Sequence, residues 1–153
     1  MKALILAGGL GTRLRSVIAD KAKPMAVVGG KPFLEYQIEW LKRFNIKDIV
    51  LCVGYLADSI KNYFGDGSKI GMNITYSYEK TQLGTAGAIK NAEKFIKGTF
   101  LVLNGDTYAK INFEKLLKFH KEKRSSLTVA LNKYKETIRY GSVSIDGEYQ
   151  IKK

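Results

Sequence analysis

Cysteine and long apolar runs are what this sequence most clearly lacks. Its one cysteine, Cys52, stands in the apolar run IVLCV, so an internal disulfide is excluded and a buried, unreactive thiol is expected. No apolar run approaches the roughly 18 residues of a membrane span, so we expect no membrane association. The N-terminal apolar run leads straight into glycines without a small-residue cleavage site, so no signal peptide is predicted and a cytoplasmic location is expected.

Acidic residues are scarce relative to basic ones. Asp and Glu number 14 against 26 Lys and Arg, which gives a formal net charge of +12. Such a charge raises the question of a polyanionic partner such as RNA. The lysines are spread over nearly every predicted helix, however, and the densest cluster, HKEKR, contains a glutamate. The prediction is therefore a solvated lysine-rich surface with no specific nucleic acid as partner.

Linkers, internal repeats and low-complexity segments are also missing, and 153 residues suit one domain with a substantial core. Hydrophobic periodicity predicts strands at 2–7, 48–53, 73–78, 99–104, 126–133, 142–145 and 149–152, and helices at 32–44, 56–64, 85–96 and 113–123. This alternation predicts an α/β, Rossmann-like fold whose mixed, mainly parallel sheet has helices on both faces. DGEY at 146–149 predicts an antiparallel turn.

Two well-known phosphate-binding motifs are incomplete in the N-terminal segment ALILAGGLGTRLRS. A dinucleotide fingerprint counted from Gly9 and Gly11 has Leu14 in place of its third glycine. A Walker loop needs a lysine after its second glycine, where this chain has Thr12 and Arg13. What remains is a tight turn whose backbone N–H groups can approach an anion. Arg13 follows it as a forked donor suited to phosphoryl oxygens.

Polar segments follow the first four predicted strands. In chain order they are GGLGTRLR, GYLADS, EKTQLGTAGA and NGDT. Ligands of open α/β sheets bind at the carboxyl ends of the strands. We therefore expect these four segments to line one ligand site.

Lys23 stands on the long loop that the glycine turn opens, and Pro24 and Met25 follow it. GGLGTRL followed by KPM resembles the signature of the sugar-1-phosphate nucleotidyltransferases, whose glycine loop, arginine and lysine hold a nucleoside triphosphate. Members of that family usually have a proline before the lysine, whereas this chain has Ala22.

Further segments extend the resemblance over most of the chain. LGTAGAI is similar to the family's contacts with base and ribose, NGDT places Asp106 where the family keeps a magnesium ligand, and RYGSV is similar to the segment that approaches the sugar through Gly141. The resemblance therefore implies Mg²⁺ as cofactor, with Arg13, Lys23 and Asp106 as catalytic residues. The implied nucleotide contacts are Leu6, Ala7, Gly8, Gly9, Gly11, Thr12, Arg13, Lys23, Gly84 and Thr85.

Within that family, RLRSVIADKAKPM and GGKPFLEYQIEWL are especially similar to guanylyltransferases that act on D-glycero-α-D-manno-heptose 1-phosphate. The alternative is a mannose-1-phosphate guanylyltransferase or another sugar-1-phosphate nucleotidyltransferase. The resemblance implies that the sugar phosphate attacks the α-phosphorus of GTP and pyrophosphate leaves, in the synthesis of surface polysaccharides. A non-catalytic nucleotide-binding regulatory module is the second alternative, which the presence of Arg13, Lys23 and Asp106 disfavours.

Members of the family continue with a strand that lines the sugar pocket and a second aspartate that shares the magnesium. The resemblance therefore implies that residues 1–153 are the nucleotide-binding part of a single nucleotidyltransferase domain, without its sugar-binding part. We expect this chain by itself to bind GTP weakly and to form little or no nucleotide sugar. Nothing in the sequence predicts an oligomeric state.

Overall fold

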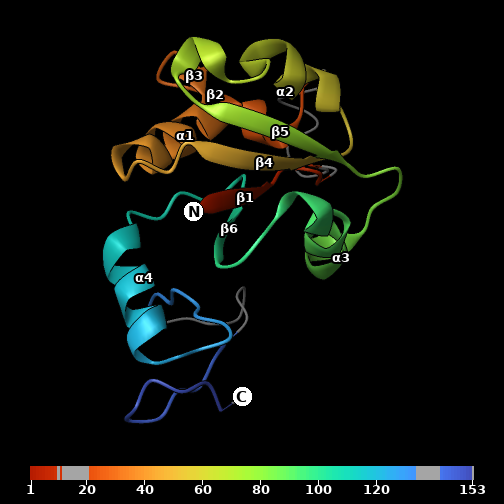
Figure 1. The fold of residues 1–153 in the computed structure, drawn as a ribbon. Helices are drawn as coiled ribbons and strands as arrows, with labels where there is room; N and C mark the ends of the chain where they lie inside the picture. The colour runs from red at the N-terminus through yellow and green to blue at the C-terminus, as the bar shows by residue number, and fades with distance from the viewer. Residues whose placement is uncertain (10, 12–20, 134–141, 153) are drawn as a thin grey trace. The chain divides into compact units, whose positions relative to one another are not determined.

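Strands and helices alternate along the first two thirds of the chain, as the periodicity predicts. The computed structural model describes residues 1–9, 11, 21–133 and 142–152. It consists of two units, residues 1–110 and residues 111–153. Figure 1 shows the four longer strands of the first unit side by side in one sheet.

The sheet of the first unit is entirely parallel. Its strands are β1 (Lys2–Leu6), β4 (Asp48–Val53), β5 (Asn73–Tyr78) and β6 (Phe100–Asn104), in the spatial order β5-β4-β1-β6. Leu6 at the end of β1 is in register with Cys52 on one side and with Asn104 on the other. The carboxyl ends of the strands therefore meet at one edge of the sheet.

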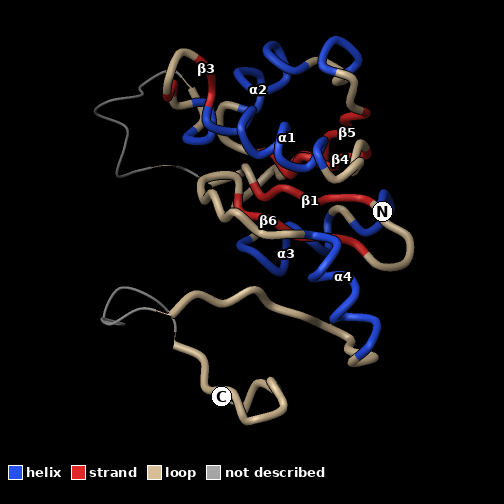
Figure 2. The backbone as a smooth tube through the Cα atoms, turned by 90° about the vertical axis from the view of Figure 1, so that its left-hand side faces the viewer, coloured by secondary structure: helices blue, strands red, loops and turns tan. Residues whose placement is uncertain are grey.

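Among the described residues, three α-helices connect these strands and cover both faces of the sheet. They are α1 (Phe33–Arg43), α2 (Ala57–Phe64) and α3 (Gly84–Asn91). α1 and α2 carry the chain one way across the sheet, and α3 carries it back from β5 to β6. Because such crossovers are right-handed, α3 belongs on the opposite face, and Figure 2 shows it across the strands from α1 and α2. The predicted fold class is confirmed.

Several short elements were not predicted. Strands β2 (Val27–Val28) and β3 (Lys31–Pro32) form a hairpin whose turn residues Gly29 and Gly30 have φ of 58° and 90°. Positive φ at both central positions is the geometry of the tightest hairpin turns. Single 3₁₀ turns occur at η2 (Lys23–Met25), η3 (Ser68–Ile70) and η4 (Glu93–Phe95). The last of these replaces the final residues of the helix predicted at 85–96.

The core of the first unit lies on both sides of β4. Residues 49–53 of this strand are all buried, which is expected of a parallel strand covered on both faces. Cys52 is fully buried, and that burial, with the charge of Glu79, raises the pKa of its thiol to about 12. The predicted burial of the thiol is therefore confirmed, and the raised pKa disfavours the reactive thiolate.

The second unit contains helix α4 (Phe113–Glu122) and a C-terminal turn. Asn112 caps the helix by accepting a hydrogen bond from the backbone N–H of Lys115 at 2.9 Å. In the turn, Asp146 and Gln150 hydrogen-bond through their backbones, and Ile145 and Ile151 form an antiparallel bridge. The antiparallel turn predicted at DGEY is confirmed.

The strands predicted at 126–133, 142–145 and 149–152 are wrong. Within these described residues, the single β-bridge between Ile145 and Ile151 is the only strand-like pairing. Leu127, Val129 and Leu131 alternate as in a half-buried strand, yet their side chains are exposed. A strand needs a neighbour to accept its backbone hydrogen bonds, and no strand pairs with residues 126–133 in the described part of the chain.

Among the residues that the structure describes, no helix is long and apolar enough to cross a membrane.

We expect Leu4→Ala to lower the free energy of unfolding by about 2–5 kcal/mol, because truncation leaves a cavity that the structure fills only in part. Leu4 is 1% exposed and packs with Val50, Cys52, Ala88 and Ala92 between β1, β4 and α3. Urea unfolding measures the loss. The control Val27→Ala, at a 63% exposed position, should change the free energy by no more than about 0.5 kcal/mol; an equal loss in both variants would contradict this assignment of the core.

Candidate functional site

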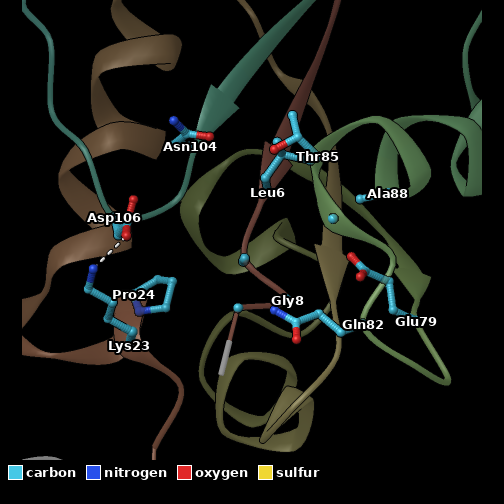
Figure 3. Close-up of a pocket in the computed structure, with 13 residues that line it drawn as sticks. Leu6, Gly8, Lys23, Pro24, Glu79, Gln82, Thr85, Ala88, Asn104 and Asp106 are labelled. Carbon is cyan, nitrogen blue, oxygen red and sulfur yellow. Dashed lines mark hydrogen bonds and ion pairs between the residues drawn. The ribbon is translucent and has the colours of Figure 1, made fainter. Parts of the chain in front are cut away.

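A pocket opens at the carboxyl edge of the sheet, where β1, β5 and β6 end. Its described lining is drawn in Figure 3. Four parts of the chain contribute to it. The end of β1 and the turn after it provide Leu6, Ala7, Gly8 and Gly9, and the region around the start of α3 provides Glu79, Gln82, Gly84, Thr85 and Ala88. The end of β6 and its turn provide Asn104 and Asp106, and the η2 turn provides Lys23 and Pro24. Most of the predicted nucleotide-contacting residues are thus brought together.

Neighbouring groups pack closely against the turn after β1. A Cβ added at Gly8 would lie 2.7 Å from Oε1 of Glu79, and one added at Gly54 would lie 3.2 Å from the carbonyl oxygen of Gly8. Gly11 has φ of 59°, in the left-handed region that favours glycine, and packs beside the side chain of Lys23. At Gly9, by contrast, an added Cβ would meet no atom of the described residues within 4 Å, so this backbone is open to a ligand on the described side.

One predicted lining segment, GYLADS after β4, does not reach the pocket among the described residues. Gly54 instead packs against the Gly8 turn. Ser59 accepts a hydrogen bond from the backbone N–H of Ala22 at 3.1 Å and donates one to the carbonyl oxygen of Leu56 at 2.7 Å. The segment therefore supports the two loops that do line the pocket.

Lys23 is held by the residues on either side of it. Pro24 and Met25 in the same turn are buried, and Ala22 is anchored by Ser59. Ala22 has φ of −60°, a value that proline also adopts. A proline at this position could not donate the hydrogen bond to Ser59, so here a side chain of α2 fixes the backbone before the lysine.

Asp106 lies in the turn that follows β6. The backbone N–H of Gly105 donates to the carbonyl oxygen of Leu6 at 2.8 Å, which continues the sheet ladder one residue beyond the strand. A Cβ at Gly105 would lie 2.8 Å from that same oxygen, so only glycine allows this approach. The turn thereby directs Asp106 toward Lys23, and Nζ of Lys23 lies 2.6 Å from Oδ2 of Asp106 (Figure 3).

Charge and hydrogen bonding keep Asp106 ionised. Partial burial favours a higher pKa, but the hydrogen bond and charge of Lys23, together with the hydroxyl of Thr107, hold the pKa of Asp106 below its usual value of 3.8. Both side chains of the ion pair are more than a third exposed. Water and a ligand can therefore reach the carboxylate and the ammonium group.

The start of α3 forms the other side of the pocket. Gly84 has φ of 68°, and Leu83 before it makes no side-chain cap. The backbone N–H of Leu83 points toward Oε2 of Glu79 at 3.4 Å. Glu79 is itself fixed, because its backbone N–H donates to the carbonyl oxygen of Val53 at 2.8 Å. Figure 3 shows its carboxylate facing the pocket on the side of α3.

Some predicted site residues lie outside the described residues. These are Thr12 and Arg13 in the glycine loop and Gly141 in the proposed sugar segment. Their roles stay predictions.

Five described pocket residues were not singled out as contacts from the sequence: Pro24, Glu79, Gln82, Ala88 and Asn104. The last four lie in the polar segments EKTQLGTAGA and NGDT, which were expected to line the site. Glu79 also begins the polar segment after β5, and a carboxylate at a strand end deserves the same weight as Asp106.

The fold and the pocket define a class: an α/β protein with a glycine turn, a lysine and a carboxylate at the carboxyl edge of a parallel sheet. Comparison with known families identifies it further. The chain belongs to the nucleotidyl transferase family, whose model matches residues 2–153.

Individual relatives are similar over almost the whole chain. D-glycero-alpha-D-manno-heptose 1-phosphate guanylyltransferase of Campylobacter jejuni subsp. jejuni is 48% identical over 95% of this chain and 64% of its own length. Probable mannose-1-phosphate guanylyltransferase 1 of Oryza sativa subsp. japonica is 39% identical over 97% of this chain and 42% of its own. The chain thus spans less than two thirds of these relatives.

A solved structure shows the same fold. HddC from Yersinia pseudotuberculosis, crystallised in complex with GMP-PN, matches with a TM-score of 0.85 and 38% identity. The match covers 98% of this chain and 66% of that one.

The lowered pKa of Asp106 predicts how stability depends on pH. The folded state binds this proton less tightly than the unfolded state, so the carboxylate stabilises the fold above about pH 4, and this contribution is lost as pH falls through the folded-state pKa. We expect the difference in free energy of unfolding between wild type and Asp106→Asn to shrink as pH falls from about 6 to about 3.

Urea titrations at each pH measure that difference. In a Lys23→Met background the shrinkage should be lost, because the main group that lowers the pKa of Asp106 is gone. A difference that grows on acidification would contradict the ion pair.

Proposed function

We propose that this chain carries the nucleotide site of a guanylyltransferase, which transfers GMP from GTP to a sugar 1-phosphate and releases pyrophosphate. The observation that carries the proposal is the convergence of the Gly8–Gly9 turn, Lys23 and Asp106 on one pocket edge. The similarity to heptose 1-phosphate guanylyltransferases supports D-glycero-α-D-manno-heptose 1-phosphate as the acceptor. Mannose 1-phosphate remains the alternative acceptor.

The chemistry of this reaction needs positioning more than covalent catalysis. An oxygen of the sugar phosphate attacks the α-phosphorus in line, and pyrophosphate leaves from the opposite side. We propose that the bare backbone of the glycine turn approaches the phosphates and that the Lys23 ammonium lies beside the oxygens that gain charge. Arg13, which follows the turn in sequence, is the predicted second cation.

Nucleotidyltransferases of this family typically need a divalent metal. Asp106 suits such an ion as one carboxylate on an accessible edge, and the described residues contain no group of three or more metal-binding side chains. Mg²⁺ commonly takes one or two carboxylates and completes its shell with substrate phosphates and water. We propose that Asp106 holds Mg²⁺ that arrives with the triphosphate, where the ion would neutralise phosphate charge.

Glu79 supports guanine as the base. An ionised carboxylate only accepts hydrogen bonds, with two oxygens side by side. Guanine presents two adjacent donors, N1–H and the N2 amino group, which match those oxygens. Uracil and thymine present a single N3–H between two acceptors, which a carboxylate matches poorly. Glu79 reaches the pocket from a fixed backbone position. We therefore propose that its carboxylate accepts hydrogen bonds from the guanine base.

A non-catalytic nucleotide-binding module is the second candidate. It would keep the glycine turn and Glu79 but would not need Lys23 paired with Asp106 at 2.6 Å. We therefore favour the enzyme. The sugar subsite, with Gly141, stays a prediction from sequence, and the use of a nucleoside triphosphate favours the cytoplasmic location expected there.

We predict that GTP with Mg²⁺ stabilises the 153-residue chain more than ATP, CTP or UTP does, because a ligand that binds only the folded state raises its apparent stability. Thermal-shift assays measure this. Glu79→Gln should abolish the preference for GTP and favour UTP, because the amide offers one acceptor and one donor. Glu93→Gln, at an exposed position outside the pocket, is the control. A larger shift with UTP in wild type would overturn the guanine assignment.

We predict that Lys23→Ala lowers turnover by about two to three orders of magnitude, the usual scale for losing one preorganised charge donor, and that Arg13→Ala does the same. Pyrophosphate release from GTP and heptose 1-phosphate, measured in the full-length protein, tests both. Lys21→Ala, an exposed lysine two positions away, serves as the control. Unchanged turnover in both variants would remove Lys23 and Arg13 from the mechanism, whereas absence of turnover in the wild type would favour the non-catalytic module.

A further inference from the structure

Gln37 is a buried polar residue in an otherwise apolar helix face. It lies in α1 and is 3% exposed, and the other buried residues of that helix are Leu34, Ile38 and Leu41. A buried amide is costly unless it is hydrogen-bonded. Its role therefore depends on what its two polar atoms contact.

The amide nitrogen of Gln37 holds both ends of the turn that carries Asp106. Nε2 donates to the carbonyl oxygen of Asn104 at 2.8 Å and also to the carbonyl oxygen of Thr107. Those two carbonyls flank Gly105 and Asp106. Because the backbone N–H of Gly105 is already bonded to Leu6, the turn is held from the sheet on one side and from α1 on the other.

The amide oxygen of Gln37 indicates that stability alone does not explain the residue. Oε1 is buried without a hydrogen-bond partner among the described residues, which costs free energy. An apolar side chain of similar size would avoid that cost. A buried polar group that packing alone would not favour often marks a functional constraint. What Gln37 provides here, and an apolar residue could not, is the pair of N–H groups that bind the Asp106 turn.

We propose that Gln37 is a positioning residue, which fixes the turn 104–107 so that the Asp106 carboxylate stays at the pocket edge beside Lys23. It touches neither nucleotide nor metal and acts only through this turn. The importance of the Asp106 position for catalysis rests on the proposed function. The positioning of the turn by Gln37 does not, because it can be measured in the turn without any ligand.

The test compares wild type with Gln37→Met, which keeps the size of the side chain and removes both donors. Leu41→Met, a fully buried position on the same helix, is the matched control for disturbed packing. Amide hydrogen exchange is followed at Gly105 and Thr107 and, for comparison, along β4. We expect exchange in the turn to be roughly tenfold faster in Gln37→Met, in line with the loss of a hydrogen bond or two, with β4 unchanged and the control like wild type.

Binding of GTP with and without Mg²⁺ forms the second measurement. Gln37→Met should weaken the Mg²⁺-dependent part of binding by roughly tenfold and leave metal-free binding unchanged, because only the carboxylate is displaced. Unchanged exchange in the turn, or equally faster exchange in β4, would overturn the proposal. Faster exchange in the turn with normal Mg²⁺ dependence would also overturn it. If wild type binds no GTP at all, the proposed function fails, and exchange alone decides whether Gln37 positions the turn.

Discussion

The parallel pairing of β1 with β6 is the constraint on which the site depends. Leu6 and Asn104 are in register, so the glycine turn and the Asp106 turn leave the sheet at the same level. The hydrogen bonds from Ala7 to Cys52 and from Gly105 to Leu6, both 2.8 Å, extend the ladder past the strand ends. A shift of one residue would turn every side chain of a strand to the other face of the sheet. Residues 3–5 of β1 and 49–53 of β4 are buried, so such a shift would exchange the side chains packed on the two faces, and the core and the site depend on the same register.

The ion pair at this edge has a positional role more than a stabilising one. Lys23 and Asp106 are both partly exposed, and exposed pairs usually contribute only about 0–1 kcal/mol. Their geometry follows from backbone anchors on either side, the buried Pro24 and Met25 for the lysine and the Gly105 ladder bond for the aspartate. The pair therefore keeps a cation and an anion accessible at fixed positions, which is what a charged ligand with a metal requires.

In the described part of the first unit, α1, α2 and α3 each contribute a polar side chain that holds a loop or strand end near the site. Gln37 of α1 holds the Asp106 turn, and Ser59 of α2 holds the backbone before Lys23. Asn91 of α3 donates to Ser77 and to the carbonyl oxygen of Tyr78, next to Glu79. Loops at a sheet edge lack ladder partners of their own, so side chains from the covering helices supply them.

The sequence by itself determined the alternation of strands and helices in residues 2–104 and the edge at which ligands bind, because periodicity and strand ends are local signals. It also singled out Lys23 and Asp106, but their contact at 2.6 Å joins residues 83 positions apart and follows only from the register of the sheet. Gln37 was not predicted, because the residues around it in the sequence do not indicate which distant carbonyls its amide binds. The strands expected at 126–133 and after failed for the same reason. Hydrogen bonds across a sheet are made between segments that the chain brings together only on folding, and no local pattern contains the partner.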